Sequence, residues 1–250
     1  MTIDFPKNSQ IPELRQLWQQ AFGDSDAFLD AFFAAGFSPD RCRCIIHNET
    51  VIAALYWFDG AYPGGKIAYL YAVATRKDYQ HQGFCRKLME ETHNVLKNAG
   101  YAGAVLVPGS KELFAFYEKM GYRSFGGIRK FSCTPSAQEI PLRQISLAEY
   151  ILLRRQYLPQ GGVLQEDAAL TFLETQAAFY TGEDVLLAAA KDGNTLYAPE
   201  LLGNPDAAPH ILHTLGATQG VFRTPGKEPF AMYLPLTIPA PPSYFGLALE

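Results

Sequence analysis

The chain has few charged residues, few cysteines and no long apolar run, and each absence excludes a class of protein. Only 18 % of its 250 residues are charged and 48 % are hydrophobic, so it has enough apolar side chains for a sizeable core and is not a disordered protein. Its apolar runs fall short of the roughly 20 residues that a membrane span requires. Its first residues lack the basic and apolar regions of a signal peptide. We therefore expect a cytoplasmic protein with no membrane partner.

Cysteine usage and charge exclude further classes. The chain has four cysteines, which are Cys42, Cys44, Cys85 and Cys133. They form no CxxC pair, and His210 and His213, three residues apart, have no evident carboxylate or cysteine partner, so we expect neither a disulfide framework nor a metal site. The net charge of −4 argues against a nucleic-acid partner.

The first half alternates helical and strand patterns. Helical spacing of apolar residues predicts helices at 12–22, around 28–33, from 84 to about 99 and at 111–120. Strands are predicted at 41–46, 51–58, 66–75, 102–107 and 122–132. The order is α-α-β-β-β-α-β-α-β, which is typical of an α/β fold with a mixed sheet.

The second half is less regular. Residues 134–141 read as a linker, followed by predicted helices at 147–158, 166–179 and 207–215 and predicted strands at 185–190, 195–201, 220–223 and 230–236. This order is close to that of the first half with pieces missing, which suggests an internal duplication. We expect domains at 1–133 and 142–250, joined by the linker.

The most informative stretch runs from Tyr69 to Arg86, where a predicted strand passes through a short polar loop into a helix. The first N–H groups of a helix lack intrahelical partners and lie at the positive end of its dipole, so they favour a phosphate. Gly83 allows close approach of an anion to the backbone. Neither the GK[ST] ending of a Walker loop nor a GxGxxG fingerprint is present. An ordinary strand–helix turn is the alternative interpretation.

Three stretches resemble one family. The residues Gln80-His81-Gln82-Gly83-Phe84-Cys85 resemble the Q/R-x-x-G-x-G/A pyrophosphate loop of the GNAT superfamily of N-acetyltransferases. The preceding residues 71–74 are similar to that family's central strand, and residues 113–122 are similar to its helix with a YEKxGF-like ending. The resemblance covers about the first half of the chain. Cys85 departs from the family pattern, because Gly or Ala is usual there.

The resemblance implies acetyl-CoA as the donor and a primary amine as the acceptor, with no metal. The backbone of Ala72, Val73 and Ala74 would bind the pantetheine and the acetyl carbonyl. Ser110 stands where the family often has an Asn that contacts the CoA arm. The pyrophosphate would be held by the loop residues Gln80, His81, Gln82, Gly83, Phe84, Cys85 and Arg86.

The resemblance also implies that Tyr117 is the general acid that protonates departing CoA. A phenol of pKa about 10 has a proton to donate at neutral pH. An amphipathic helix can instead use such a tyrosine for packing. The general base stays open: Asp59, at the end of a strand, Tyr69 and the terminal carboxylate of Glu250 are weak candidates, and water can also serve.

The second half has no such loop, so we infer that it binds no CoA and instead shapes the acceptor site or forms an interface. Residues 134–250 contain 6 basic and 12 acidic residues, a net charge of −6, which suits an amine-bearing acceptor. The main hypothesis is a bacterial acetyl-CoA-dependent N-acetyltransferase, with a small molecule or peptide as acceptor and a homodimer as a possible assembly. A non-catalytic acyl-CoA sensor on the same fold is the alternative.

Overall fold

The computed structural model describes residues 1–165 and 168–249. The chain divides into two compact units. Unit 1 comprises Met1–Arg123 and Tyr233–Pro241, and unit 2 comprises Ser124–Met232 and the segment that begins at Pro242. The expected linker, 134–141, therefore lies inside unit 2, and a short C-terminal segment belongs to the first unit rather than the second.

Unit 1 is a mixed sheet with helices on both faces. Its helices are α1 (Ile11–Phe22), α2 (Asp26–Ala31), α3 (Phe84–Asn98) and α4 (Lys111–Glu118), with a π-helical turn at Phe32–Gly36 and 3₁₀ turns at Asn8–Gln10, Pro39–Arg41 and Lys77–Tyr79. Its strands are β1 (Thr2–Asp4), β2 (Cys42–His47), β3 (Thr50–Tyr62), β4 (Gly65–Thr75) and β5 (Gly103–Leu106). They lie in the order β1-β2-β3-β4-β5, followed by β14 (Ala231–Pro235), whose end from Tyr233 belongs to this unit.

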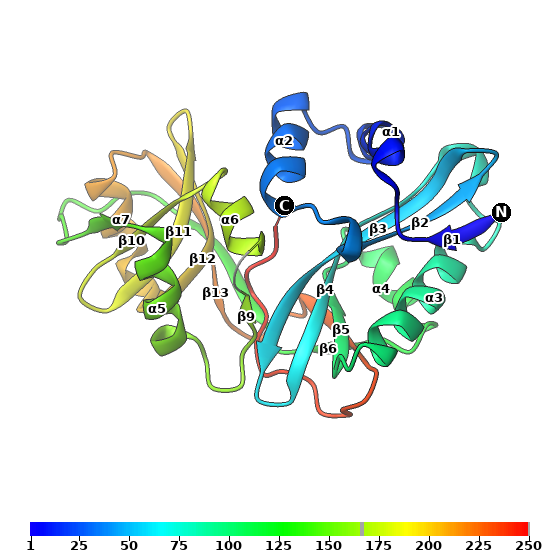
Figure 1. Ribbon diagram of the computed structural model, residues 1–250. Helices are drawn as coiled ribbons and strands as arrows, with labels where there is room; N and C mark the ends of the chain where they lie inside the picture. Colours follow the sequence, from blue (N-terminus) through cyan, green and yellow to red (C-terminus); the bar gives the residue numbers. More distant parts are fainter. Residues whose placement is uncertain (166–167, 250) are drawn as a thin grey trace. The chain divides into compact units, whose positions relative to one another are not determined.

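Local sequence explains the first two helices. The Ser25 hydroxyl caps α2 by accepting a hydrogen bond from the Phe28 N–H at 3.2 Å. On the sheet side, Trp18 of α1 packs against Tyr56 of β3 and Tyr71 of β4, with ring centroids 5.1 and 5.5 Å apart. This aromatic cluster fixes α1 on one face of the sheet, and α3 lies on the opposite face (Figure 1).

Unit 2 also has a mixed sheet. Its elements are β7 (Ile128–Cys133), β8 (Arg143–Ile145), α5 (Leu147–Tyr157), β9 (Leu164–Gln165), α6 (Ala168–Glu174), β10 (Ala178–Thr181), β11 (Val185–Asp192), β12 (Thr195–Gly203), a 3₁₀ turn at Pro205–Ala207, α7 (Ala208–Thr214) and β13 (Gln219–Pro225). The strand order is β7-β13-β12-β11-β10-β8. Strands β12 and β13 are parallel, and the other neighbours are antiparallel.

Two predicted elements differ from the structure. The strand predicted at 122–132 is split into β6 (Arg123–Phe125) and β7 by Gly126 and Gly127. A Cβ on either glycine would lie 2.7 Å from a backbone oxygen, so both turn positions require glycine. The helix predicted at 166–179 ends at Glu174, and Phe179 lies in β10. Its first two residues, Glu166 and Asp167, lie outside the described residues.

The two units repeat one pattern. In each, an antiparallel pair is followed by a helix and then by a strand parallel to the second strand of the pair: β3-β4-α3-β5 in unit 1 and β11-β12-α7-β13 in unit 2. This shared order confirms the expected α/β class with a second, smaller unit of the same type. Within the described part of the chain, no helix combines the length and apolar composition needed to cross a bilayer.

Candidate acetyl-CoA site

Strand β4 contains a bulge at Ala72 and Val73. Tyr71 pairs with Tyr56 and Ala74 pairs with Ala54, so the two residues between them oppose only Leu55. Ala72 has a φ of +47°, a conformation that non-glycine residues rarely adopt. Because a bulge leaves its extra residue without a ladder partner, backbone polar groups become free at this point of the strand.

Strand β5 stops short of the bulge. Its parallel pairing with β4 covers Ile67, Ala68 and Tyr69, and β5 ends at Leu106. Pro108 follows two residues later, and proline has no N–H with which to continue a ladder. In the described part of the sheet, the β5-facing edge of β4 from the bulge to Thr75 is therefore not covered by β5. An extended ligand has room to hydrogen-bond along it.

The loop after β4 opens the N-terminus of α3. The side-chain amides of Gln80 and Gln82 donate to the backbone oxygens of Thr75 and Asp78 at 3.1 and 2.9 Å and hold the loop closed. His81 and Gly83 have φ values of +59° and +84°. Gly83 is the N-cap residue of α3, has no capping side chain, and has open space where a Cβ would stand. The first N–H groups of the 15-residue helix thus face an open, side-chain-free position.

The basic residues near this loop divide into two groups. The Arg76 guanidinium donates to Val51 O at 2.7 Å and to the Glu13 carboxylate at 2.7 Å, so it ties the loop to α1 rather than serving an anion. Three exposed cations have no ion pair with any described residue: Lys77, Arg86 and Lys87. These three, with the helix dipole, make the α3 N-terminus electropositive.

Tyr117 lies in the last turn of α4 and is 7 % exposed. Its ring packs edge-on against Phe116 and Tyr122, with centroids 5.2 and 5.7 Å away. Burial raises the pKa of Tyr117, and the nearby Cys85 raises it further, so the phenol is protonated at neutral pH. Among the described residues, no hydrogen-bond partner of the Tyr117 hydroxyl is found, which leaves it available to a ligand.

Cys85 connects the loop to this tyrosine. It is half-buried in the first turn of α3, and burial raises the pKa of its thiol to about 11, although Arg86 acts in the opposite direction. The thiol therefore stays neutral and behaves as a small apolar side chain. Its electrostatic influence on Tyr117 shows that the structure brings the start of α3 and the end of α4 together.

Asp59, the first candidate base, is committed elsewhere. Its carboxylate accepts a hydrogen bond from the Tyr101 hydroxyl at 2.5 Å and pairs with Lys66 at 3.1 Å and Arg41 at 3.4 Å. Both of its oxygens are thus engaged in a structural cluster. Tyr69 is 3 % exposed and stacks on Phe58 at 6.2 Å, which favours packing.

Glu250 and Ser110 are the remaining predicted site residues. Glu250 lies outside the described residues. Ser110 is exposed at the residue before α4, and a hydrogen bond from its hydroxyl lowers the pKa of Glu112. It lies on the loop after β5, as a contact with an extended ligand arm would require.

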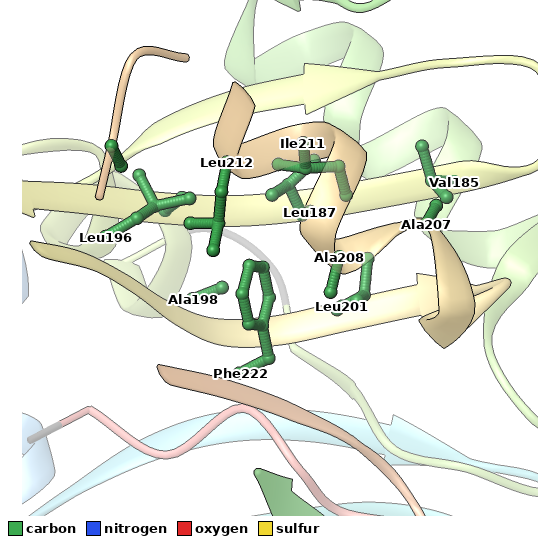
Figure 2. Packing of buried hydrophobic residues seen from close by; sticks show 12 residues of the cluster. Val185, Leu187, Leu196, Ala198, Leu201, Ala207, Ala208, Ile211, Leu212 and Phe222 are labelled. Atoms are coloured by element: carbon green, nitrogen blue, oxygen red, sulfur yellow. The ribbon is translucent and has the colours of Figure 1, made fainter. Parts of the chain in front are cut away.

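In unit 2 the equivalent strand edge is closed. β12 also has a bulge, because Ala198 and Pro199 oppose only Ala189, but here the parallel strand pairs as far as Ala198 through Phe222. Figure 2 shows the Phe222 ring among the apolar side chains of β12 and α7, and Phe222 is fully buried. The helix α7 has seven residues, and Pro209 in its first turn removes an N–H donor. Among the described residues of unit 2, neither an uncovered strand edge nor an anion-binding loop is formed.

A known protein family matches the part of the chain that forms most of unit 1. The family model described as "Acetyltransferase (GNAT) domain" matches residues 2–125, which include the bulge, the loop and Tyr117. The chain therefore carries a GNAT acetyltransferase domain. This confirms the family inferred from residues 71–74, 80–85 and 113–122. No curated protein sequence matches the chain.

Solved structures extend the likeness beyond the GNAT domain. The chain is similar to a GCN5-related N-acetyltransferase from Anabaena variabilis, with 16 % identity, a TM-score of 0.73 and coverage of 94 % of this chain and 73 % of that one. A GCN5-related N-acetyltransferase from Kribbella flavida gives 15 % identity, a TM-score of 0.69 and coverage of 93 % and 70 %. At such identities the likeness concerns the fold, and it spans both units.

Sequence reasoning missed two features of the GNAT domain. The bulge at Ala72 has no sequence signal, since alanine gives no hint of a positive φ. The other is the buried pair of His93 and Tyr122, which lie 29 residues apart in the sequence and are brought together only by the fold. Arg76 is basic and stands beside the loop in the sequence, but the structure pairs it with Glu13.

Proposed function

We propose that the protein is an acetyl-CoA-dependent N-acetyltransferase that transfers an acetyl group directly to a primary amine. The observation that carries this proposal is the uncovered edge of β4 at the bulge, beside an electropositive helix N-terminus that has no capping side chain. An extended pantetheine followed by a pyrophosphate has the shape and charge that this pair of features accepts. The GNAT domain at residues 2–125 supports the same substrate.

The residues of the GNAT domain divide the work of binding. The N–H groups from His81 to Arg86 hold the pyrophosphate, with Gly83 keeping their approach open and Gln80 and Gln82 fixing the loop. The backbone of Ala72, Val73 and Ala74 bonds the pantetheine and directs an N–H at the acetyl carbonyl. Ser110 lies on the loop where it meets the same arm.

Chemistry requires one bond to form and one to break. The amine nitrogen bonds to the acetyl carbon while the carbon–sulfur bond of the thioester breaks, and the amine's proton passes to water. Tyr117 gives its proton to the departing sulfur and is afterwards reprotonated from solvent. We assign Asp59 no part in this step, because its oxygens are engaged by Tyr101, Lys66 and Arg41.

We propose a different role for unit 2. Its strand edge is closed by Phe222 and its helix α7 lacks an anion loop, so we propose that it binds no CoA. Its excess of acidic residues supports a part in selecting an amine-bearing acceptor.

The test is the release of free thiol from acetyl-CoA by the whole chain in the presence of a panel of amines. The panel comprises a polyamine, an aminoglycoside, free amino acids and peptides with a free N-terminus. Release that depends on one amine and yields its acetylated product is the expected result. Binding of acetyl-CoA without amine-dependent release from any member would instead favour a non-catalytic sensor.

A further inference from the structure

A buried hydrogen bond joins α3 to the turn that follows α4. His93 lies on the inner face of α3 and is 8 % exposed, and its Nε2 is 2.8 Å from the hydroxyl of Tyr122, which is 1 % exposed. The two rings are also in contact, with centroids 5.6 Å apart. Thr92, the neighbouring buried polar residue of α3, donates only within its own helix, to Leu88 O at 2.8 Å.

Tyr122 is in turn connected to Tyr117 in two ways. Its ring packs edge-on against the Tyr117 ring at 5.7 Å. Its N–H donates to the Tyr117 carbonyl at 3.1 Å, because the chain reverses at Gly121, where φ is +92°. The position of Tyr122 therefore fixes both the ring and the backbone of Tyr117.

We propose that His93 is a positioning residue that holds Tyr117 in place for proton transfer, acting through Tyr122. The inference rests on the proposed function, in which Tyr117 is the proton donor. A hydrogen bond is directional, whereas the apolar contacts around it allow a ring to slide, so this bond fixes the angle at which Tyr122 meets Tyr117. Since α3 also begins at the anion loop, the same bond holds the donor in register with the bound pyrophosphate.

The state of His93 suits this role. Burial lowers its pKa to about 4, so the ring is neutral at physiological pH. One ring nitrogen of a neutral imidazole donates and the other accepts, so the bond to Tyr122 persists at physiological pH. His93 touches no reacting atom, and its effect reaches the reaction only through the two tyrosines.

The first test does not depend on the acceptor. 3-Fluorotyrosine is placed at position 117 and its fluorine resonance is recorded in the whole chain saturated with CoA. His93→Phe is expected to shift or broaden the resonance, and His93→Gln, which keeps a polar group near Tyr122, to bring it back towards the parent position. Thr92→Val is the matched control, because it removes a buried hydrogen bond of the same helix without touching Tyr122. A resonance unchanged in His93→Phe would overturn the proposal.

The second test is kinetic and uses an amine accepted from the panel. His93→Phe should lower kcat roughly tenfold and leave the KM for acetyl-CoA within twofold, since misplacing a catalytic group slows the reaction without weakening binding. In the Tyr117→Phe background it should cost no further activity. If His93→Phe does not fold, Tyr122→Phe takes its place.

The outcomes separate the two claims. Loss of kcat in Tyr117→Phe with none in His93→Phe overturns the positioning role and leaves the general acid standing. Equal losses from His93→Phe in both backgrounds also overturn it, because they indicate a purely structural effect. No loss of kcat in Tyr117→Phe overturns the general acid itself and the positioning role with it.

Discussion

Two properties of Tyr117 suit it to proton donation, and the buried Tyr56 of the GNAT domain shares both. The Tyr117 phenol is held protonated by burial, and its hydroxyl has no hydrogen-bond partner among the described residues. Tyr122 bonds to His93, and Tyr101 bonds to Asp59. The sequence predicted the role of Tyr117 through a family motif, whereas its environment is set by residues far away in the chain.

Tyr117→Phe removes only the hydroxyl and keeps the ring that packs on Phe116 and Tyr122. We expect kcat to fall by a factor on the order of ten to a thousand, because general acid catalysis typically contributes about 10²–10⁴-fold to a rate. The Kd for acetyl-CoA, measured on the same samples, should stay within twofold. Unchanged turnover would remove Tyr117 from the reaction.

His93 makes stability depend on pH at acid values. Its pKa is lowered from 6.5 to about 4 by burial, so the unfolded chain binds a proton in that interval that the folded chain refuses. The free energy of unfolding should therefore fall as pH drops from 6.5 towards 4, by up to about 3 kcal/mol. Urea unfolding at several pH values should show this slope reduced in His93→Gln. The exposed His81 is the control, and His81→Gln should retain the slope.

At the scale of elements, β4 is the part that sequence reasoning predicted least completely. Its bounds and its central place in the sheet follow from the apolar run at 66–75. Its bulge does not, because an alanine at positive φ is imposed by the pairing of β3 with β4 rather than by its own preference. The strand predicted at 122–132 was wrong because Gly126 and Gly127 form a turn inside it. The residues on either side of this turn favour strands, so the turn did not stand out in the sequence pattern.

Substitutions at Ala72 test the bulge. Glycine accepts a φ of +47°, so Ala72→Gly should leave stability nearly unchanged, whereas the β-branched side chain of Ala72→Val should cost about 1–3 kcal/mol. Because the strain is relieved by flattening the bulge, we also expect Ala72→Val to weaken acetyl-CoA binding at least tenfold. Ala61→Val, at an exposed strand position, is the control for both readouts. Equal affinities in Ala72→Val and the parent would show that the bulge does not hold the ligand.

At the scale of the whole molecule, one supersecondary pattern occurs twice with different outcomes. In unit 1 the parallel strand ends before the bulge and leaves an edge uncovered, and in unit 2 it reaches the bulge and covers it. The order of elements within this pattern could be read from the sequence, including the suspected repeat, whereas β1, β8 and β10 were not predicted. The closing of the second edge could not, because it depends on the register of two strands. The return of Tyr233–Pro241 to unit 1 was also missed: three consecutive N–H groups from Leu236 to Ile238 converge on the Ala102 carbonyl.

Unit 2 contains a buried ion pair of a kind that the described core of unit 1 lacks. Glu200 is fully buried and accepts from Arg154 at 2.6 and 3.0 Å and from the Tyr150 hydroxyl at 2.9 Å. Glu200→Gln leaves the Arg154 charge buried without its partner and should lower the free energy of unfolding by about 3–5 kcal/mol. Glu149→Gln breaks the exposed pair with Arg143 and should change it little. Denaturant unfolding of both variants decides the comparison.

Calorimetric titration of acetyl-CoA into two glycine variants tests whether the N-terminus of α3 holds acetyl-CoA. Gly83 and Gly100 flank the same helix at φ values of +84° and +80°, and each has open space where a Cβ would stand. Gly83→Ala and Gly100→Ala should thus lose similar stability, about 1 kcal/mol each. We expect a micromolar Kd for the parent and for Gly100→Ala, and at least tenfold weaker binding for Gly83→Ala. Equal affinities in the two variants, or no binding by the parent chain, would contradict the assignment of acetyl-CoA to this helix end.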